Sequence, residues 1–282
     1  MRLFSLPRRI DPGLLQTRGI SAANAVDLTF TRYGELEADR KHAPLLICHG
    51  LFGQKSNWNS VGKAIQRRLG NVVYAVDLRN HGDAPHIPSM SYTEQAADVQ
   101  KLIKKICDEG SFKKVNLLGH NPNGGHLLDR LIIEDVSPKG YSISSHLFKD
   151  YVDAMKSANL RKSRQDISKD LEKAVPELPI RQFLLTNLRA GSDGGFEWKV
   201  NLDAIGQHFG ELLGCDLPVG AFRGKTLFIY GERSGYVPDT DRPLIRNLFP
   251  QVEFHSIAEA GHWVHADQPK AFIDGICGFI EK

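Results

Sequence analysis

The stretch Ala43–Gly53, APLLICHGLFG, joins an apolar run of strand length to a turn that glycines border. Ala43–Cys48 contains no polar side chain, which is typical of a strand buried on both faces of a parallel sheet. The turn at His49–Gly53 follows the carboxyl end of that strand, where open parallel sheets bind their ligands. The stretch therefore predicts a parallel sheet with a binding edge.

The rest of the chain alternates short apolar runs with longer amphipathic ones. We expect further strands at 26–33, 72–77, 114–118, 130–136, 226–230 and 252–257, and helices at 58–69, 92–106 and 269–280. This alternation predicts an α/β fold, in which a mostly parallel central sheet carries helices on both faces.

A polar, helix-prone segment interrupts the alternation between Lys139 and Phe222. We expect helices there at 147–159, 166–175, 180–188 and 198–213. The segment is interpreted as a helical cap at about 139–222 within one domain that spans 22–282. A separate helical domain with its own role is the alternative.

The first 21 residues differ in composition from the body. They carry four arginines and one acid, Asp11, with apolar residues between them. This composition predicts a mitochondrial transit peptide, and hence a protein of the mitochondrial matrix; a disordered basic tail is the alternative. Without those charges the net charge of +3 falls to about zero, so nucleic acid is not an expected partner.

The sequence does not favour a membrane-spanning protein or a disulfide-stabilised one. No run of eighteen or more apolar residues occurs, so we expect no transmembrane segment. The four cysteines are scattered and form no CxxC pair, which favours buried thiols in a reducing compartment over a disulfide framework.

Glycine- and histidine-containing motifs follow four of the predicted strands. They are His49–Gly53, Asp77–Asp83, Leu118–His120 with the glycines at 124 and 125, and Ala260–Trp263. In this order they resemble the α/β-hydrolase superfamily, whose nucleophile elbow reads G-x-S-x-G and whose triad histidine comes last.

Longer stretches narrow the resemblance. HGLFGQKSNWNSV, DLRNHGDAPH, MSYTEQAADV, EDVSP, RQFLLTNL, VNLDAIGQH and AGHWVHAD resemble the mitochondrial α/β-hydrolase domain-containing protein eleven type and related bacterial esterases. The resemblance implies hydrolysis of carboxylic esters or thioesters through an acyl-enzyme, with a small acyl ester, thioester or lipid as substrate and no cofactor.

The resemblance also implies roles for individual residues. His262 takes the place of the general base. The acid is Asp135 at a strand end, with Asp203 in VNLDA as the alternative; we prefer Asp135 because a strand end is stiffer than a cap helix. Ser234 stands where the superfamily acid usually stands and is expected to hydrogen-bond nearby as an auxiliary residue.

The oxyanion hole and the remaining histidines complete the expected site. Leu51 and Phe52 would supply the oxyanion N–H groups. We expect no metal, because the other candidate histidines lie on different loops without metal-ligand spacing and are better explained as turn-stabilising residues. These histidines are His49, His81, His120 and His126.

The chain departs from the family pattern at the elbow. Gly119–Gly125 reads GHNPNGG, so Asn121, or Pro122 when counted from the glycine pair, replaces the nucleophilic serine. Neither side chain can attack a carbonyl, and proline restricts the backbone that an elbow needs. We therefore expect activity to be severely reduced or absent.

The helix that follows the elbow is missing as well. Only four residues separate Gly125 from the strand expected at Arg130, too few for the usual helical crossover. The chain would retrace one strand length in extended form or turn back as an antiparallel hairpin at Asn123-Gly124, and either solution leaves a cavity or exposed apolar surface.

Two hypotheses follow from this gap. The chain is a shortened version of an active esterase, through a lost exon or a mistaken gene model, or it is a pseudoenzyme that binds a ligand without chemistry. A protein-interaction role in the matrix is a third class, with partners that the sequence does not identify.

Overall fold

The computed structural model describes residues 24–36, 41–119, 125–139, 145–192, 194–213 and 221–282. Its main sheet has seven strands in the order β1-β3-β2-β4-β5-β8-β9, and β1 alone is antiparallel to its neighbour. The strands are β1 (Thr29–Tyr33), β2 (Leu45–Cys48), β3 (Val73–Asp77), β4 (Val115–Leu118), β5 (Leu128–Glu134), β8 (Lys225–Gly231) and β9 (Val252–Ile257). The mostly parallel sheet confirms the predicted fold class.

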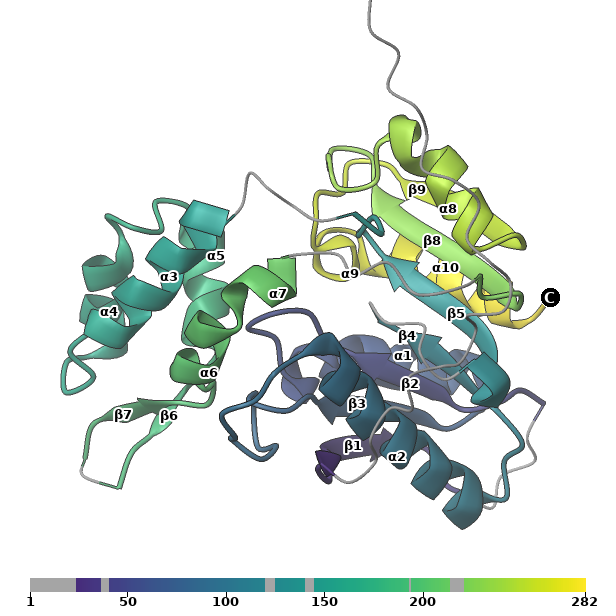
Figure 1. Cartoon of the computed structure of the whole chain (residues 1–282), viewed down its shortest axis with the longest axis horizontal. Helices are drawn as coiled ribbons and strands as arrows, with labels where there is room; N and C mark the ends of the chain where they lie inside the picture. Colours follow the sequence, from purple (N-terminus) through teal and green to yellow (C-terminus); the bar gives the residue numbers. More distant parts are fainter. Residues whose placement is uncertain (1–23, 37–40, 120–124, 140–144, 193, 214–220) are drawn as a thin grey trace, which may run out of the picture.

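Helices cover both faces of this sheet (Figure 1). The apolar side chains of α1 (Asn59–Leu69) and α10 (Pro269–Ile280) pack on one face, and those of α2 (Tyr92–Gly110) and α8 (Arg242–Leu248) pack on the other. Short helical turns lie at the strand ends: η3 (Lys55–Trp58), η4 (Gly125–Leu127), η5 (Asp239–Asp241) and α9 (Val264–Asp267). The central strands β2, β3 and β4 are buried throughout, as burial on both faces requires.

Local sequence signals set the ends of the long helices. α2 begins after Ser91, whose hydroxyl accepts from the Glu94 N–H while the Glu94 carboxylate accepts from the Ser91 N–H. This reciprocal capping satisfies backbone donors that no helical carbonyl can reach. α1 ends at Gly70, whose φ of 66° is a left-handed conformation that glycine adopts without strain.

The connection from β4 to β5 joins parallel strands. Leu117 pairs with Leu131 and Leu118 with Ile132, so the antiparallel hairpin considered for this region is wrong. Within the described part of the connection the one helical turn is η4. The sequence predicted a cavity or exposed apolar surface here. Exposed surface is not found at Leu117, Leu131 and Ile133, which are buried. They belong to the cluster with α2 and α8, against which Leu127 of η4 also packs.

A separate group of elements connects β5 to β8, and we refer to residues 145–213 as the cap segment. It contains α3 (Ser145–Ser157), α4 (Arg164–Leu171), α5 (Leu178–Leu185), β6 (Leu188–Ala190), β7 (Phe196–Trp198), α6 (Leu202–Gln207) and α7 (Phe209–Leu213). These elements lie together beside the main sheet (Figure 1) and share an apolar core, to which Phe52 and Met90 from the loops of the sheet also belong.

Several polar contacts attach the cap segment to the loops of the sheet. The Asn187 amide donates to the Phe52 carbonyl (2.8 Å), and the Gln54 amide donates to the Thr186 carbonyl (2.8 Å). The Asn201 N–H donates to the Asn80 carbonyl (2.9 Å). The cap segment is therefore anchored to the loops that follow β2 and β3, at the carboxyl edge of the sheet.

Candidate functional site

Asp135 directly follows β5 and is fully buried. Its backbone has a φ of 43°, an uncommon left-handed conformation for a residue other than glycine. The carboxylate accepts from the Gly231 N–H (3.2 Å), the Ser234 hydroxyl (2.5 Å) and Nδ1 of His262 (2.7 Å). Three hydrogen bonds compensate for the burial of the charge and fix the orientation of the carboxylate.

His262 lies in the turn between β9 and α9, and its side chain is 43% exposed. Since the Asp135 carboxylate accepts from Nδ1, the Nδ1–H tautomer is favoured and Nε2 keeps a lone pair. No residue in the described part of the chain forms a hydrogen bond with that Nε2. The Tyr236 ring stacks on the imidazole with centroids 4.2 Å apart. The imidazole is thus held at Nδ1, and its Nε2 is without a hydrogen-bond partner among the described residues.

Gly231, at the end of β8, allows the histidine turn to approach. A Cβ on Gly231 would lie 2.2 Å from the Gly261 carbonyl oxygen, so a side chain there would displace the turn. The Arg233 N–H also donates to the Ala260 carbonyl (2.9 Å). These close contacts bring the end of β9 to the ends of β8 and β5.

Ser234 is a partner of the same carboxylate. Its hydroxyl donates to Oδ2 of Asp135 (2.5 Å) and accepts from the Tyr236 N–H (3.2 Å). Because its proton is directed at the carboxylate and not at an imidazole nitrogen, this geometry suits a supporting hydrogen bond and does not suit an attacking oxygen.

Asp203 lies apart from this group. It is in the first turn of α6, its side chain is 81% exposed, and its carboxylate pairs with Nζ of Lys156 (2.6 Å). The acid that the structure brings to His262 is Asp135, the one preferred from the sequence.

The two expected oxyanion donors differ in their surroundings. Phe52 has a φ of 61°, and its N–H donates to Nε2 of His81 (3.2 Å), so it is already engaged. The Leu51 N–H has no hydrogen-bond partner within the described ranges. Of the two amides, Leu51 is the one available to a ligand.

His49 and His81 are buried and hold the loops after β2 and β3. Nε2 of His49 accepts from the Leu78 N–H (3.1 Å), and Nδ1 of His81 contacts the Arg79 carbonyl (3.0 Å). Burial lowers the pKa of His49, and burial with the neighbouring His49 lowers the pKa of His81 to about 3. Both rings are neutral at physiological pH. Among the described residues no group of side chains has the arrangement of a metal site.

Asn121 and His120 lie outside the described residues. Gly119, the last described residue before them, follows β4 and donates its N–H to the Ile132 carbonyl (3.0 Å). A Cβ on Gly119 would lie 2.9 Å from Cβ of Cys48 at the end of β2. Gly119 therefore marks the same carboxyl edge that carries Leu51 and Asp135. The expected transit peptide also lies outside the described residues.

A second carboxylate–histidine pair lies next to the first, and the sequence analysis missed it. Oε1 of Glu134 accepts from Nδ1 (2.7 Å) and from the backbone N–H (3.0 Å) of His265. Trp58 stacks on the His265 ring with centroids 4.2 Å apart. The available signal was the adjacent acids Glu134-Asp135 and the two histidines of AGHWVHAD, which are three positions apart.

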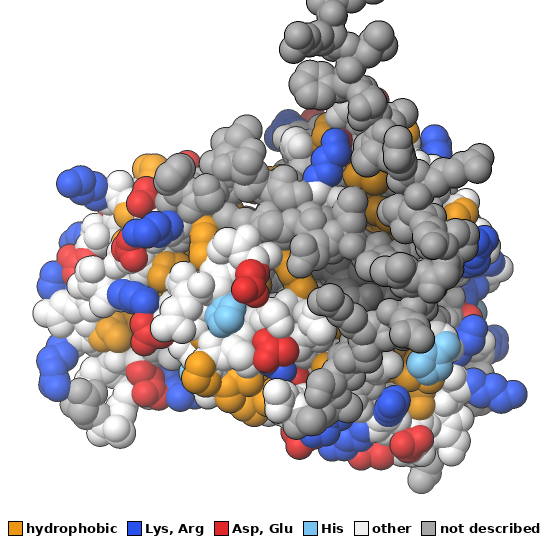
Figure 2. Space-filling model, in the orientation of Figure 1, with side chains coloured by type: hydrophobic (Ala, Val, Ile, Leu, Met, Phe, Trp, Pro, Cys, Tyr) orange, Lys and Arg blue, Asp and Glu red, His pale blue; other side chains and the backbone are white. Residues whose placement is uncertain are grey.

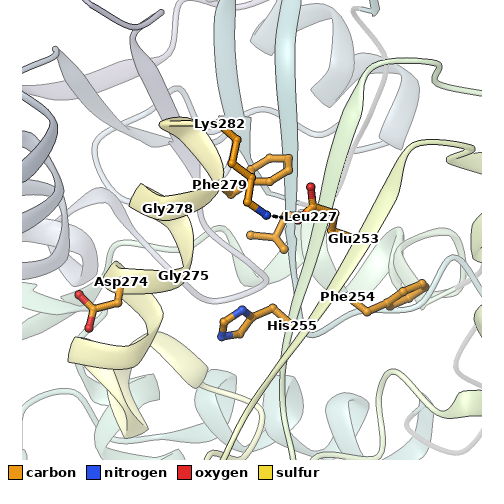
Figure 3. Close-up of a pocket in the computed structure, with 9 residues that line it drawn as sticks. All are labelled: Leu227, Glu253, Phe254, His255, Asp274, Gly275, Gly278, Phe279 and Lys282. Carbon is orange, nitrogen blue, oxygen red and sulfur yellow. Dashed lines mark hydrogen bonds and ion pairs between the residues drawn. The ribbon is translucent and has the colours of Figure 1, made fainter.

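A cavity of about 250 Å³ lies elsewhere, between β9 and α10 (Figure 3). Its lining includes Leu227, Glu253, His255, Gly275 and Phe279, and none of the expected site residues. The Lys282 ammonium pairs with the Glu253 carboxylate at one end of it. The hollow is therefore separate from the His262 site.

The surface in Figure 2 carries positive and negative side chains intermixed over the cap segment and the sheet. Nucleic-acid interfaces usually concentrate one sign of charge, and this face does not. Within the described ranges, no helix has both the length and the apolar content needed to cross a bilayer.

The fold and the Asp135–His262 geometry define an α/β hydrolase. Residues 45–274 match the model of the alpha/beta hydrolase family, and the chain therefore belongs to that family. The resemblance predicted from the motifs is confirmed.

Named relatives are lipases and esterases. The chain is 36% identical to the sn-1-specific diacylglycerol lipase ABHD11 of Mus musculus over 264 residues, which cover 88% of this chain and 84% of the relative. It is 28% identical to the esterase YbfF of Escherichia coli strain K12, with 85% and 93% covered. Its structure matches a marine microorganism esterase with a TM-score of 0.79 and 31% identity, covering 90% of this chain and all of the other.

Proposed function

We propose that this chain has the architecture of a carboxylic ester or thioester hydrolase of the serine type, and that its turnover is impaired because the nucleophile is absent. The observation that supports the architecture is the 2.7 Å contact between Nδ1 of His262 and the Asp135 carboxylate. A buried carboxylate fixes the tautomer of a general-base histidine and stabilises its protonated form.

The described residues suit three parts of acyl transfer. Nε2 of His262 is the base that would accept a proton from an attacking hydroxyl and return it to the leaving group. Asp135, supported by Ser234, orients the imidazole. The Leu51 N–H is the oxyanion donor contributed by the loop after β2. No cofactor is required for these roles.

The fourth part is missing from the sequence. Position 121 is asparagine, and an amide oxygen does not become an acyl carrier as a serine alkoxide does. Proline at position 122 further restricts the backbone of the turn. We therefore propose that hydrolysis is severely reduced or lost in the chain as written.

A pseudoenzyme is the second candidate. Gly119–Gly125 lacks serine, while the cap segment keeps a buried core and its contacts with the loops of the sheet. Such a protein would bind an acyl ligand or a protein partner without chemistry. The lipase and esterase names of the relatives support esters, thioesters or lipids as the ligand class.

The proposal extends to the chain's organisation and location. We propose a helical cap at about 139–222 within the hydrolase domain and a mitochondrial matrix location, supported by the arginine-rich first 21 residues. Import into isolated mitochondria with cleavage near residue 21 would support the location. Full-length protein that stays outside would contradict it.

A fluorophosphonate probe, which modifies activated serines, tests the missing nucleophile. We expect no labelling of this chain, because Ser234 directs its proton at Asp135. The matched variant replaces Gly119–Gly125 by a serine-containing elbow and a following helix, and we expect it to be labelled and to hydrolyse esters in a way that needs His262. Labelling of Ser234 in the unchanged chain would contradict the proposal.

A further inference from the structure

Glu134 and Asp135 are adjacent at the end of β5, and each holds a histidine of the same short segment. Asp135 contacts His262, and Glu134 contacts His265. The second pair is well shielded, since the side chains of Glu134 and His265 are 12% and 18% exposed. The strand end therefore holds the histidine segment at two points.

His265 is fixed from three directions. Oε1 of Glu134 accepts from both its ring and its backbone N–H, which determines the position of the residue as well as of the side chain. Trp58 of η3 stacks on the ring at 4.2 Å, and Phe272 of α10 lies at 6.0 Å. His265 thus links β5, η3 and α10.

The segment between the two histidines is closed by its own hydrogen bonds. The Gly261 N–H donates to the Asp267 carboxylate (2.8 Å), and the Ala266 and Asp267 N–H groups donate to the Trp263 carbonyl (2.9 and 2.8 Å). A segment closed in this way moves as one piece, so the position of His265 constrains that of His262.

The charges of the second pair reinforce the contact. Burial opposes ionisation of Glu134, but its contacts with His265 outweigh burial and lower its pKa. Burial likewise disfavours protonated His265, but Glu134 outweighs it and raises the pKa of His265. Asp267 is the other charge facing His265, and His262 is within electrostatic range of Glu134. An ionised pair is therefore favoured next to His262.

From these contacts we propose that Glu134 and His265 are positioning residues for the reaction inferred above. Their pair fixes residues 261–267 to the end of β5 and thereby holds the His262 ring against Asp135. This inference rests on the proposed function for its purpose, but its geometry can be measured without turnover.

The test is the proton on Nδ1 of His262, observed by NMR of the chain with ring-labelled histidines. In the unchanged chain the hydrogen bond to Asp135 should protect this proton from exchange with water. Glu134→Gln removes the charge and keeps the shape, and we expect exchange to become about tenfold faster or more, equivalent to about 1.4 kcal/mol. The matched control is Glu259→Gln, an exposed acid near the same turn that pairs with Arg233. It should leave the exchange rate unchanged.

Two further variants keep the result interpretable. Asp135→Ala removes the carboxylate that accepts this proton and should abolish the protection, which identifies the signal. His265→Gln retains a side-chain donor and the backbone N–H toward Glu134, so it should lose less of the protection than Glu134→Gln does. Equal protection in the unchanged chain, Glu134→Gln and His265→Gln would overturn the inference. Protection that follows the predicted order while the elbow-restored chain fails to hydrolyse esters would overturn the proposed function alone.

Discussion

Among single residues, Asp135 makes the hydrogen bonds that hold the site together. One buried carboxylate satisfies the Gly231 N–H, the Ser234 hydroxyl and the His262 ring. Removing it leaves buried donors without an acceptor. An unsatisfied buried donor lowers the free energy of unfolding by more than a hydrogen bond contributes to it.

Asp135→Ala should therefore lower the free energy of unfolding by about 2–4 kcal/mol. Asp203→Ala is the matched control, because Asp203 is exposed and its ion pair with Lys156 is a surface pair. We expect that change to stay within about 0.5 kcal/mol. Urea unfolding at pH 7 measures both. An equal decrease in the free energy of unfolding in the two variants would contradict the role of Asp135 as the acceptor for three buried donors.

The buried histidines predict a dependence of stability on pH. The pKa of His81 is lowered from 6.5 to about 3 in the folded chain, so the unfolded chain binds more protons between these values. Stability should accordingly fall as the pH drops below 6.5, with a contribution from His81 of about 2 kcal/mol between pH 7 and pH 5. His81→Asn should flatten that fall in urea unfolding measured at both pH values. An unchanged slope would mean that His81 titrates normally in the folded chain.

The effect of His265 on the pH dependence of stability is opposite to that of His81. Its pKa is raised in the folded chain by the contact with Glu134, so its contribution is fully present below pH 6.5 and is lost as the pH rises through the raised value. Comparing the pH dependence of unfolding for the unchanged chain and Glu134→Gln measures this contribution. The variant should lose stability mainly below pH 6.5 and above the pH at which Glu134 itself becomes protonated. Loss confined to high pH would contradict this sign.

The sequence predicted which residues lie at the site, but it did not predict all of the contacts that these residues make. His262 and Asp135 were predicted from the resemblance of their motifs to the hydrolase family. Asp135 directly follows β5 and His262 lies in the turn after β9, at the carboxyl edge where parallel strands end. The contact between Phe52 and His81 was not predictable, because a left-handed backbone at Phe52 redirects its N–H. The Glu134–His265 pair was missed because its importance depends on burial by Trp58, which lies far away in the sequence.

At the scale of elements, the cap segment shows where periodicity misleads. A single helix was expected over 198–213, but Phe196–Trp198 forms β7 and pairs with β6. Asn201 then starts α6, since its side chain accepts from the Ala204 N–H. The three glycines at 191, 194 and 195 and the capping Asn201 are local signals, and an apolar periodicity over the whole stretch conceals them.

Two helix glycines give a matched pair of tests. A Cβ on Gly62 of α1 would lie 2.7 Å from the Tyr33 ring, whereas a Cβ on Gly278 of α10 would meet nothing within 4 Å. Gly62→Ala should lower the free energy of unfolding by about 1–3 kcal/mol through overpacking. Gly278→Ala should raise it by about 0.5–1 kcal/mol through helix propensity. Thermal unfolding of both variants checks the signs, and stabilisation by Gly62→Ala would contradict the packing of β1 on α1.

At the scale of the whole molecule, the fold was the most predictable feature. Alternating strands and helices determine a parallel sheet, because parallel neighbours need crossovers and both faces must be covered. The choice between a parallel and an antiparallel return after β4 was left open by the sequence. The structure has the parallel return, in which Leu117, Leu131 and Ile133 stay buried with the side chains of α2 and α8.

The molecule thus combines a hydrogen-bonded Asp135–His262 pair with a Gly119–Gly125 segment that contains no serine. Sequencing of the transcript across Leu118–Leu131 bears on how this arose. A message that encodes an elbow and helix absent from this sequence would favour a shortened enzyme. A message that encodes Leu118–Leu131 as in this sequence, with no segment missing, would favour a pseudoenzyme.

We propose that His262 and Asp135 are arranged for general-base catalysis but lack a nucleophile from which His262 could accept a proton. Hydrolysis of a short-chain nitrophenyl ester by the purified chain, beside His262→Ala, tests it most directly. We predict that the two proteins hydrolyse the ester at the same low rate while both elute as compact species. Turnover by the unchanged chain that His262→Ala abolishes would contradict this proposal, because it would require a nucleophile elsewhere in the chain.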